Sequence, residues 1–425
     1  NQRTPERQQS SHAESCMSHK LYPGSIISKT APTVTAPLLN EGGSASGIWT
    51  RDQANYYIAN GTWPKPFISG TLWSAGRNNQ GQLGVGNTTY YSSPKQVSGS
   101  VSTWARVSGG HNFCVGIRTN NSLYVWGQNN YGQMCLPTAI YYQKAPYNFG
   151  GASNWLFASA GYNHLVATKT DNTLWAWGGA ADGQLGTGSR TDLSSPTQIG
   201  TLTNWLITAA GYKFSLAIKT DGTLWSWGRN NYGQLGLNNA TYYSSPVQVG
   251  SLTNWSNCVA GYTHALAIKT DGTLWSWGDN SYGQLGIGNN FNRSSPVQIG
   301  ALTSWLNSSM TGTIYSSFIV RSSGTAWSWG RNVEGQLGLG NTTNYSSPKQ
   351  IGALATWASV AQGNASRCMA MTKTDGTLWS WGANTGGQLG LGNTTNYSSP
   401  KQVGSNTNWL KAGAHTNQSI TSMQT

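Results

Sequence analysis

Short runs of alternating apolar and polar residues recur along most of the chain. In one stretch, residues 204–253, the runs KFSLAIKT and TLWSWG are separated only by Asp221 and Gly222. An Asp-Gly pair between two alternating runs is the strongest short-range signal for a β-hairpin. Two more short runs, NWLITAA and PVQVG, flank this pair, and no helical periodicity lies between them. The pattern predicts a unit of about four antiparallel strands.

The unit is repeated seven times. The motif GQLG, or GQMC in the second copy, recurs every 50 to 52 residues, beginning at Gly81, Gly132, Gly183, Gly233, Gly283, Gly335 and Gly387. Nineteen of the 21 tryptophans fall at three repeat positions, leaving only Trp49 and Trp63 outside them. An aromatic side chain that recurs in every unit is best explained as filler between neighbouring sheets.

The two ends of the repeat region complete each other. The run KAGAHTNQSITS, residues 411–422, matches the first half of a unit and stops where the Asp-Gly hairpin would follow, while residues 69–76, SGTLWSAG, supply the missing half. The sequence therefore predicts an all-β fold: a seven-bladed β-propeller of four-stranded antiparallel blades, closed by pairing of the N- and C-terminal strands. We place this domain at residues 67–425.

The motifs of one unit resemble regulator-of-chromosome-condensation repeats. These motifs are G-x-x-H, then D-G-T-L-W-x-W-G-x-N-x-x-G-Q-L-G, then S-S-P-x-Q-V. The resemblance implies a seven-bladed propeller that serves as an interaction platform, in a family that includes an exchange factor, an ultraviolet-B receptor and a β-lactamase inhibitor. The even spacing leaves no room for the exchange factor's inserted loop. Tyr162, Tyr212 and Tyr262 stand where the light receptor has tryptophan, so the resemblance implies the fold but not the function.

Composition and side-chain chemistry argue against an enzyme. Charged residues make up 9% of the chain, the net charge of +13 is dispersed, and the five cysteines form no C-x-x-C pair. Neither a disulfide framework nor a zinc site is expected. His164 and His264 share a repeat position in separate units, and we interpret them as bonding the backbone of a neighbouring blade. We expect no catalytic residue, no cofactor and no metal.

Carboxylates at the predicted hairpins have a structural interpretation. Each of Asp171, Asp221, Asp271 and Asp375 follows a lysine by two residues, Lys169, Lys219, Lys269 and Lys373 respectively. Asp at such a position is typical of turns, and the lysine is close enough for a local ion pair. We therefore predict turn residues with local ion pairs rather than acid–base pairs.

Positions that differ between units are the candidates for function, because shared positions build the scaffold. Two such positions are basic: the residue after W-G or A-G, and the residue after S-S-P. In a closed ring, the sixth, seventh and first units are neighbours. The resulting candidates for partner binding, predicted to gather in one sector, are Arg77, Lys95, Arg331, Lys349 and Lys401. A solvated surface without a partner is the alternative.

Aromatic residues precede S-S-P in most units. Rings among Asn, Ser and Thr offer flat apolar faces and adaptable hydrogen bonds, which suit both sugars and protein partners. Packing of each ring against its own loop is the alternative. The candidate partner-binding tyrosines are Tyr90, Tyr91, Tyr242, Tyr243, Tyr345 and Tyr397.

The first sixty-six residues differ from the repeats. Residues 1–46 are rich in Ser, Thr, Pro and Gln, and we predict an extended arm that anchors the protein in an assembly. Residues 47–66 predict one short helix, because Thr50 and Gln53 form a capping box and Asn60-Gly61 is a stop signal.

This helical segment also carries a second resemblance. Its G-I-W-T-x-D-Q-x-x-Y-Y-x-x-x-G-x-W-P pattern resembles a stretch of structural proteins of marine bacteriophages, and Trp49, Tyr57 and Trp63 are the candidate anchoring residues. The resemblance implies a virion component. The segment would then connect the propeller to other virion proteins.

We therefore expect a non-enzymatic virion structural protein of a bacteriophage, located in the virion in several copies. A fibre, spike or decoration component of this kind would use its propeller for assembly contacts or for recognition of a host-surface glycan or protein. We expect neither specific nucleic-acid binding nor a membrane span. The alternative is a cellular or secreted propeller, extracellular or at the cell surface, that binds a protein partner.

Overall fold

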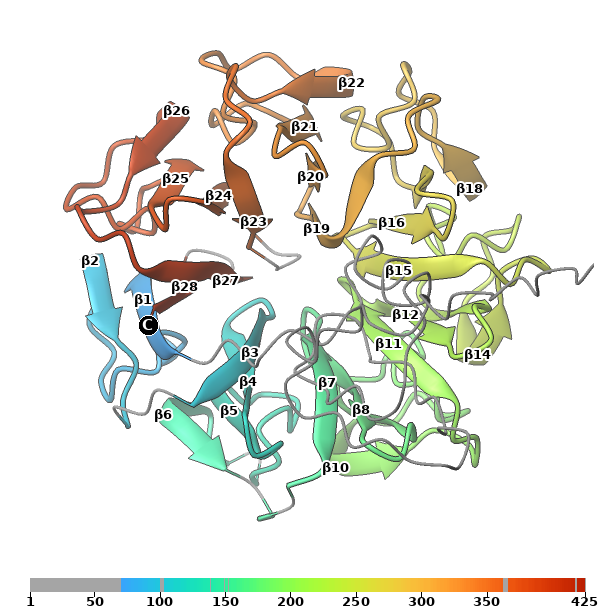
Figure 1. Ribbon diagram of the computed structural model, residues 1–425. Coiled ribbons are helices and arrows are strands. Elements are labelled where there is room, and N and C mark those ends of the chain that lie inside the picture. The colour runs from blue at the N-terminus through green and yellow to red at the C-terminus, as the bar shows by residue number, and fades with distance from the viewer. Residues whose placement is uncertain are drawn as a thin grey trace, which may run out of the picture. The chain divides into compact units, whose positions relative to one another are not determined.

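The computed structural model describes residues 70–99, 103–137, 139–148, 150–151, 153–361, 366–416 and 419–424. Across these residues the strands form seven four-stranded antiparallel sheets arranged as blades around one axis, and no helix is present (Figure 1). The predicted all-β seven-bladed propeller is confirmed. The predicted arm (1–46), the predicted helix (47–66) and the candidate anchors Trp49, Tyr57 and Trp63 lie outside the described residues.

In every blade the first strand lies nearest the axis and the fourth lies at the rim (Figure 1). The first two blades are β3 (Trp104–Gly109), β4 (Phe113–Arg118), β5 (Leu123–Gln128) and β6 (Tyr142–Asn148), then β7 (Trp155–Ala160), β8 (His164–Lys169), β9 (Leu174–Gly178) and β10 (Leu193–Gln198). The next two are β11 (Trp205–Ala210), β12 (Phe214–Lys219), β13 (Leu224–Gly228) and β14 (Tyr243–Gln248), then β15 (Trp255–Ala260), β16 (His264–Lys269), β17 (Leu274–Gly278) and β18 (Arg293–Gln298).

The remaining three blades complete the ring. Two of them are β19 (Trp305–Gly312), β20 (Ser316–Arg321), β21 (Ala326–Gly330) and β22 (Tyr345–Gln350), then β23 (Trp357–Val360), β24 (Cys368–Lys373), β25 (Leu378–Gly382) and β26 (Tyr397–Gln402). The last, which we call the closing blade, consists of β27 (Trp409–Thr416), β28 (Ser419–Gln424), β1 (Thr71–Gly76) and β2 (Tyr91–Gln96).

The closing blade joins strands from the two ends of the repeat region. Its β1 pairs antiparallel with β28, with Thr71 opposite Gln424 and Gly76 opposite Ser419. Residues more than three hundred positions apart therefore share one sheet, as their complementary sequences predict. Pairing of this kind closes the ring within one sheet and leaves only the short edges of each blade.

The Asp-Gly hairpin has the predicted turn chemistry. Asp221 accepts hydrogen bonds from the backbone N–H and the hydroxyl of Thr223, at 2.9 and 2.6 Å, and these bonds are the main reason that its pKa is lowered. Gly222 has a φ of 77°, and a Cβ there would lie 2.2 Å from a backbone oxygen. Only glycine fits this position without strain.

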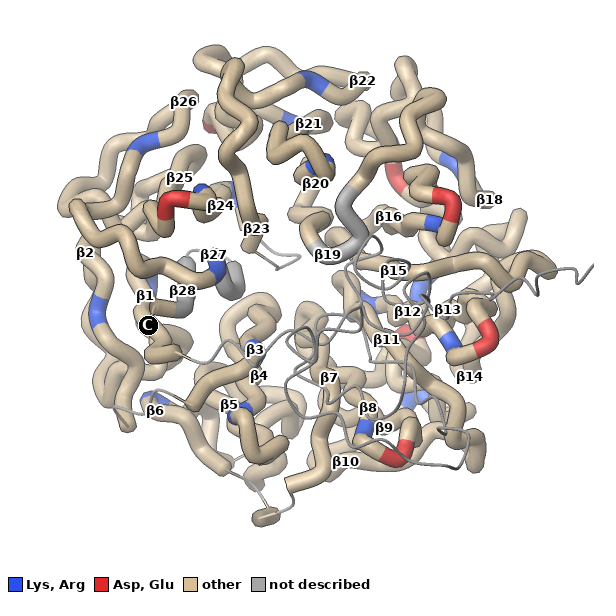
Figure 2. The backbone as a smooth tube through the Cα atoms, in the orientation of Figure 1, with Lys and Arg blue, Asp and Glu red and all other residues tan. Residues whose placement is uncertain are grey.

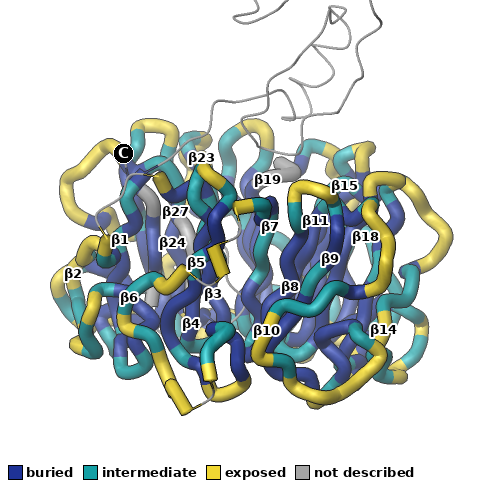
Figure 3. Tube along the Cα trace, turned by 90° about the horizontal axis from the view of Figure 1, so that it is seen from below, coloured by how far each residue is buried: buried dark blue, intermediate teal, exposed yellow. Residues whose placement is uncertain are grey.

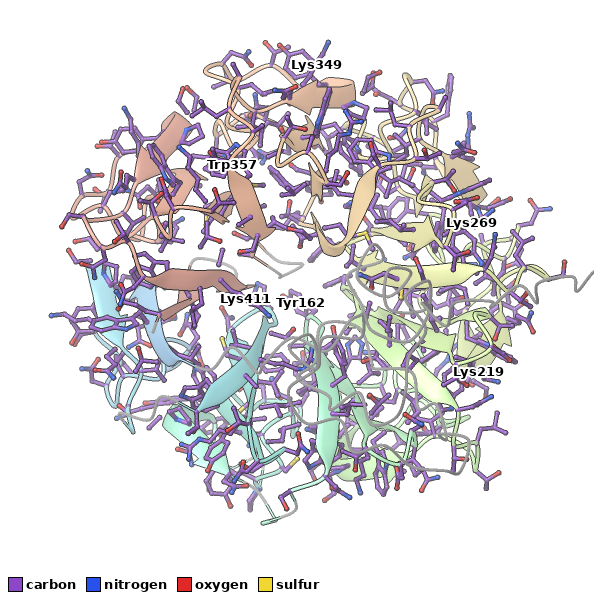
Figure 4. The ribbon with its side chains drawn as sticks, viewed as in Figure 1. Tyr162, Lys219, Lys269, Lys349, Trp357 and Lys411 are labelled. Atoms are coloured by element: carbon purple, nitrogen blue, oxygen red, sulfur yellow. The ribbon has the colours of Figure 1, made fainter. Side chains whose placement is uncertain are left out.

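The lysine of each hairpin lies over indole rings, and no ion pair between these lysines and the hairpin aspartates occurs among the described residues. The Lys219 ammonium lies 3.8 Å from the ring centroid of Trp225 and 4.7 Å from that of Trp205. Its charge contributes a smaller part of the lowered pKa of Asp221. The same arrangement recurs at Lys169, Lys269 and Lys373 (Lys219 and Lys269 are labelled in Figure 4). The cation–π contact with the two indoles is therefore the repeated feature, where a local ion pair was predicted.

The core lies between the blades, where Figure 3 shows buried backbone between two ends of exposed loops. Indoles from the third strands fill these walls, and each is fully buried: Trp126, Trp177, Trp227, Trp277, Trp329 and Trp381. The indole N–H of Trp227, for example, donates to the backbone oxygen of Gln184 in the preceding blade at 2.9 Å. The repeated GQLG motif thus supplies the acceptor that holds the next blade. No helix in the described part of the chain is long and apolar enough to cross a membrane.

Candidate functional site

Four tyrosines from consecutive blades meet at one end of the ring. Each lies in a loop between the first and second strands of its blade, and Tyr162 is found near the axis of the ring (Figure 4). Tyr212 and Tyr262 are stacked with ring centroids 4.1 Å apart, and Tyr162 meets Tyr212 edge-on at 4.6 Å. Tyr315 lies 6.3 Å from Tyr262. We call Tyr162, Tyr212, Tyr262 and Tyr315 the tyrosine cluster.

Backbone hydrogen bonds between successive loops set the spacing of these rings. The N–H of Tyr162 donates to the carbonyl of Gly211, that of Tyr212 to Tyr262, and that of Tyr262 to Thr313, at 3.0–3.2 Å. Each bond joins one blade to the next. The rings are therefore presented by a linked set of loops, which reduces the conformational entropy that a partner must overcome.

A second set of tyrosines surrounds the cluster. The loops between third and fourth strands reach the same end of the ring, because antiparallel strands alternate in direction. They carry Tyr131 and Tyr232, which are 39% and 37% exposed, and Tyr282, whose ring lies 4.9 Å from that of Tyr315. Together these rings form an aromatic surface on one side of the axis.

Charged side chains border this surface. The guanidinium of Arg229 lies 5.6 Å from the Tyr212 ring centroid, and that of Arg331 lies 5.9 Å from the centroid of Tyr282. Lys213 forms an ion pair with Asp182 at 3.1 Å. Arg331 also pairs with Glu334, which is shared with the more exposed Arg367 at 3.6 Å. An aromatic centre with a charged rim is the usual anatomy of a protein-binding surface.

Three hydroxyls of the cluster and a neighbouring histidine stay neutral near pH 7. Burial raises the pKa of Tyr162, Tyr262 and Tyr315, so their hydroxyls remain protonated and can donate hydrogen bonds. The His111 ring lies 4.1 Å from Tyr162, and its pKa is lowered to about 4 by burial and by the nearby charge of Arg77. The surface therefore offers neutral donors and flat rings between a few charges.

Three of the described cysteines are enclosed. The Cys114, Cys258 and Cys368 thiols are buried, and burial raises their pKa to about 12. No group of three or more His, Cys, Asp or Glu that could hold a metal occurs among the described residues. The groups that are accessible at the tyrosine cluster are hydroxyl donors and aromatic rings, which suit the binding of a partner.

The repeated histidines link neighbouring blades. His164 Nε2 lies 3.0 Å from the Ser215 hydroxyl of the next blade, and Ser215 donates in turn to the Gln184 carbonyl. His264 makes the same contact with Ser317 at 2.9 Å. The predicted link to a neighbouring blade is present, but its partner is a serine hydroxyl and not the backbone; the Gln184 carbonyl that Ser215 reaches belongs to the blade of His164 itself. Burial lowers the pKa of His164 to about 3 and that of His264 to about 4.

The candidate basic residues lie in three consecutive blades, as predicted, and form two groups within this sector. Arg77 and Arg331 lie on loops at the end of the ring that carries the tyrosine cluster, and Arg77 donates to the Tyr90 hydroxyl at 3.1 Å. Lys95, Lys349 and Lys401 lie on the outermost strands β2, β22 and β26, where they are exposed (Figure 2). The correct blade order was predicted, but the two groups differ in distance from the axis.

The candidate tyrosines of the S-S-P loops mostly show repeated packing. An asparagine side chain four residues earlier donates to each hydroxyl of Tyr91, Tyr243, Tyr345 and Tyr397 at 3.0–3.3 Å. A lysine ammonium also lies 5.4–5.5 Å from the ring centroids of Tyr91, Tyr345 and Tyr397. Tyr90 is 48% exposed, whereas Tyr242 is half-buried. These contacts favour the packing alternative at the four repeated positions.

Sequence reasoning missed the tyrosine cluster as a site. In the sequence, Tyr162, Tyr212 and Tyr262 stand out only as departures from the tryptophans of a light receptor, and Tyr315 lies outside that pattern. A signal was present, since one aromatic residue follows the same glycine in three consecutive units. Residues confined to neighbouring blades of a ring must lie close together.

The fold and the repeated contacts define a class: a seven-bladed propeller built from units whose tryptophan binds the glutamine carbonyl of the preceding unit. Comparison with known families identifies the units as regulator of chromosome condensation (RCC1) repeats. They match residues 69–117, 171–218, 221–268, 323–368 and 375–420, with a second RCC1 repeat family matching 104–133 and 259–284. The matches cover more than half of the chain, so it belongs to the RCC1 repeat family.

Curated relatives share only parts of this chain. The ultraviolet-B receptor UVR8 of Arabidopsis thaliana is 29% identical over 137 residues, which is 30% of each chain. Protein RCC2 of Mus musculus is 43% identical over 89 residues, 20% of this chain and 17% of RCC2. The matched segments therefore span less than a third of these relatives.

Solved structures share the whole propeller. Prp20p of Saccharomyces cerevisiae, described with its binding to Gsp1p and histones, superposes with a TM-score of 0.75 at 18% identity, covering 84% of this chain and 92% of that chain. Yeast RCC1 (Prp20) bound to Kap60 gives 0.76 at 16% identity, covering 99% and 97%. Human WBSCR16 gives 0.73 at 17% identity, covering 84% and 99%. At these identities the likeness concerns the fold.

Proposed function

We propose that this propeller is a non-catalytic binding module whose protein partner docks on the tyrosine cluster and its charged rim. The observation that carries the proposal is the set of interlocked rings of Tyr162, Tyr212, Tyr262 and Tyr315 at one end of the ring. Tyrosine supplies a large contact area at low entropic cost and is enriched among residues that dominate binding energy.

The position of the cluster supports a partner that binds off-centre. The cluster draws on the loops after β7, β11, β15 and β19, which are four consecutive blades of seven. Arg229, Arg331 and the ion pair of Lys213 with Asp182 lie beside the rings rather than between them. The structural neighbours Prp20p and Kap60-bound yeast RCC1 are described with protein partners, which makes a protein the reasonable occupant here.

The test removes the rings and keeps the scaffold. Replacing Tyr162, Tyr212 and Tyr262 together by alanine should weaken binding of any protein that co-purifies stoichiometrically from the native source by at least about tenfold. The matched control is the triple variant Lys95→Ala, Lys349→Ala, Lys401→Ala, which removes three exposed cations from the outer strands. Equal binding by the tyrosine variant, with circular dichroism showing a folded propeller, would disprove this function.

We further propose that the assembly served by this module is a bacteriophage virion. The support is the resemblance of residues 47–66 to structural proteins of marine phages, together with the polar composition of residues 1–46. Deletion of residues 1–66 should leave a folded propeller that no longer enters particles. Unchanged incorporation into particles would exclude the virion role and leave a cellular or secreted binding module.

A glycan array addresses the finer question of host recognition. The intact protein is compared with variants in which the loops of Tyr90, Tyr91, Tyr345 and Tyr397 are shortened. Binding that is lost on shortening would support a host-surface glycan as a ligand. Absence of binding in every form would assign the propeller to assembly contacts alone.

A further inference from the structure

Three consecutive blades share an almost identical segment at the rim of the ring. Residues 341–350 and 393–402 both read NTTNYSSPKQ, and residues 87–96 read NTTYYSSPKQ, which differs only at Tyr90. These segments lead into and include β22, β26 and β2, the outer strands of three neighbouring blades (Figure 1). The second strands of the same blades differ, in contrast, and read SSFIVR, CMAMTK and SITSMQ. The other four blades lack both the Asn-Thr-Thr run and the lysine, so the common repeat does not explain the identity.

The lysine of each segment is presented in the same way. Lys95, Lys349 and Lys401 are exposed, and each ammonium lies 5.4–5.5 Å from the ring centroid of the tyrosine four residues earlier. Lys349 is found at the rim (Figure 4). An asparagine that donates to the tyrosine hydroxyl holds each of these rings in place. The packing of the tyrosine therefore sets the position of the cation beside it.

No carboxylate neutralises these lysines on the outer strands. The sequences of the seven outer strands contain five cations, the three lysines together with Lys144 and Arg293, and no Asp or Glu (Figure 2). The ion pairs between described residues do not include Lys95, Lys349 or Lys401. In the other four blades the same register position is neutral and holds Tyr147, Thr197, Val247 and Val297. The three lysines thus form a positive sector of the rim, which favours an anionic ligand.

The groups around the lysines suit a sugar better than a protein strand. Each segment contains a proline, and proline has no N–H to donate, which disfavours addition of a protein strand at these edges. Exposed hydroxyls, which can donate to and accept from sugar hydroxyls, flank each lysine. These hydroxyls belong to Thr89, Ser93, Thr343, Ser347, Thr395 and Ser399.

The spacing of the segments favours a polymer over a small anion. Each blade has four strands, and a strand separation of about 4.8 Å puts the outer strand at least about 14 Å from the axis. One-seventh of a turn then separates neighbouring outer strands by at least about 12 Å. A single carboxylate reaches only one lysine. A chain with repeated charges reaches all three, and each further contact gains from the effective concentration that the first contact creates.

We propose that the rim segments around Lys95, Lys349 and Lys401 form one binding site, in three equivalent parts, for an acidic polysaccharide of the uronic-acid type. The lysines bind successive carboxylates of the polymer, and the flanking Ser and Thr hydroxyls bind its sugar hydroxyls. This inference rests on the proposed recognition of a glycan and names the class of glycan and the residues that bind it. It is independent of the tyrosine cluster.

The test uses the full chain with polygalacturonate and alginate, two uronic-acid polymers, in biolayer interferometry at several ionic strengths. We expect saturable binding that weakens as salt screens the lysines. The triple variant Lys95→Gln, Lys349→Gln, Lys401→Gln should bind at least about tenfold more weakly, and monomeric galacturonate should bind the wild type at least about a hundredfold more weakly than the polymer. The matched control is Lys144→Gln, Arg190→Gln, Arg293→Gln, which removes the same charge from other blades and should change affinity by about threefold or less.

Three further probes test the class of ligand: neutral dextran, polyglutamate and duplex DNA. We expect each to bind at least about tenfold more weakly than the uronic-acid polymers. Equal binding of polyglutamate or DNA would overturn the assignment to a polysaccharide. Equal losses in the two triple variants, or no saturable binding of either uronic-acid polymer, would overturn the site.

Two outcomes separate this inference from the proposed function. A variant with Tyr162, Tyr212 and Tyr262 replaced by alanine should keep its full affinity for polygalacturonate, because the tyrosine cluster and the rim are different surfaces. Loss of polymer binding in this variant, with circular dichroism showing a folded propeller, would contradict the rim site. A neutral glycan whose binding depends on the loops would leave glycan recognition standing and overturn the acidic class.

Discussion

The walls between blades and the loop end of the ring use aromatic side chains in opposite ways. In the walls, fully buried indoles such as Trp227 recur in six blades and bind the preceding blade's backbone. At the loop end, half-buried tyrosines from four consecutive blades contact one another. Repetition around the whole ring marks scaffold, whereas restriction to neighbouring blades marks an asymmetric surface that a partner can recognise.

The largest expected effect concerns the walls. Trp227→Ala should lower the free energy of unfolding by about 3–5 kcal/mol, because it leaves a cavity and removes the donor to Gln184. Tyr212→Ala, in the same repeat but on the loop end, should cost less than half as much. Urea unfolding followed by circular dichroism gives both values. Equal losses would show that the two regions do not differ as we describe.

The buried histidines of the walls predict a dependence of stability on pH. Because burial lowers the pKa of His164 and His264 to about 3 and 4 in the folded chain, both stay neutral while the unfolded chain takes up protons below pH 6.5. Their contribution to the free energy of unfolding is complete above pH 6.5. It falls with decreasing pH, by roughly 2 kcal/mol for each histidine at pH 5.

Replacement of one histidine provides the control for this pH dependence. His264→Gln should lower stability at pH 7, because it disturbs the contact with Ser317, and it should reduce the loss of stability between pH 6.5 and 5. Denaturant unfolding at several pH values measures this. A variant that keeps the full pH dependence of the wild type would rule out His264 as its source.

The smallest effect concerns the tyrosines at the start of the outer strands. Their hydrogen bonds recur in several blades, as do those of the wall tryptophans. Tyr345→Phe removes the hydroxyl that accepts from Asn341 at 3.2 Å. We expect a loss of about 0.5–1 kcal/mol in unfolding free energy and unchanged partner binding. Thermal unfolding and a binding assay of the same sample check both. A marked loss of binding would move this residue from the scaffold to the site.

Much of the fold could be predicted because each unit repeats the same turn and tryptophan positions. The Asp221-Gly222 turn, the recurring tryptophans and the complementary ends were sufficient for blade number, strand order and closure. The Gln184 carbonyl as the partner of Trp227 was not predictable, since a backbone acceptor leaves no trace in the side-chain pattern. What the indole binds became known only from the packing of adjacent blades.

The candidate site was predictable only in part. The repeat order placed Arg77 and Lys95 in the same blade. Sequence spacing carries no information on distance from the axis, however, and Lys95 lies on an outer strand. Stacking of Tyr212 on Tyr262 depends on how loops fifty residues apart converge at the axis. The shared position of these tyrosines in consecutive repeats was the available signal.

One measurement tests the central claim most directly: photo-cross-linking from the two kinds of tyrosine position in the native assembly. A photoreactive phenylalanine derivative is placed at Tyr212 in one sample and at Tyr345 in another, and cross-linked peptides are identified by mass spectrometry. We predict that position 212 cross-links to another protein and that position 345 does not. Cross-links to a partner from position 345, with none from position 212, would contradict the assignment of the tyrosine cluster as the binding surface.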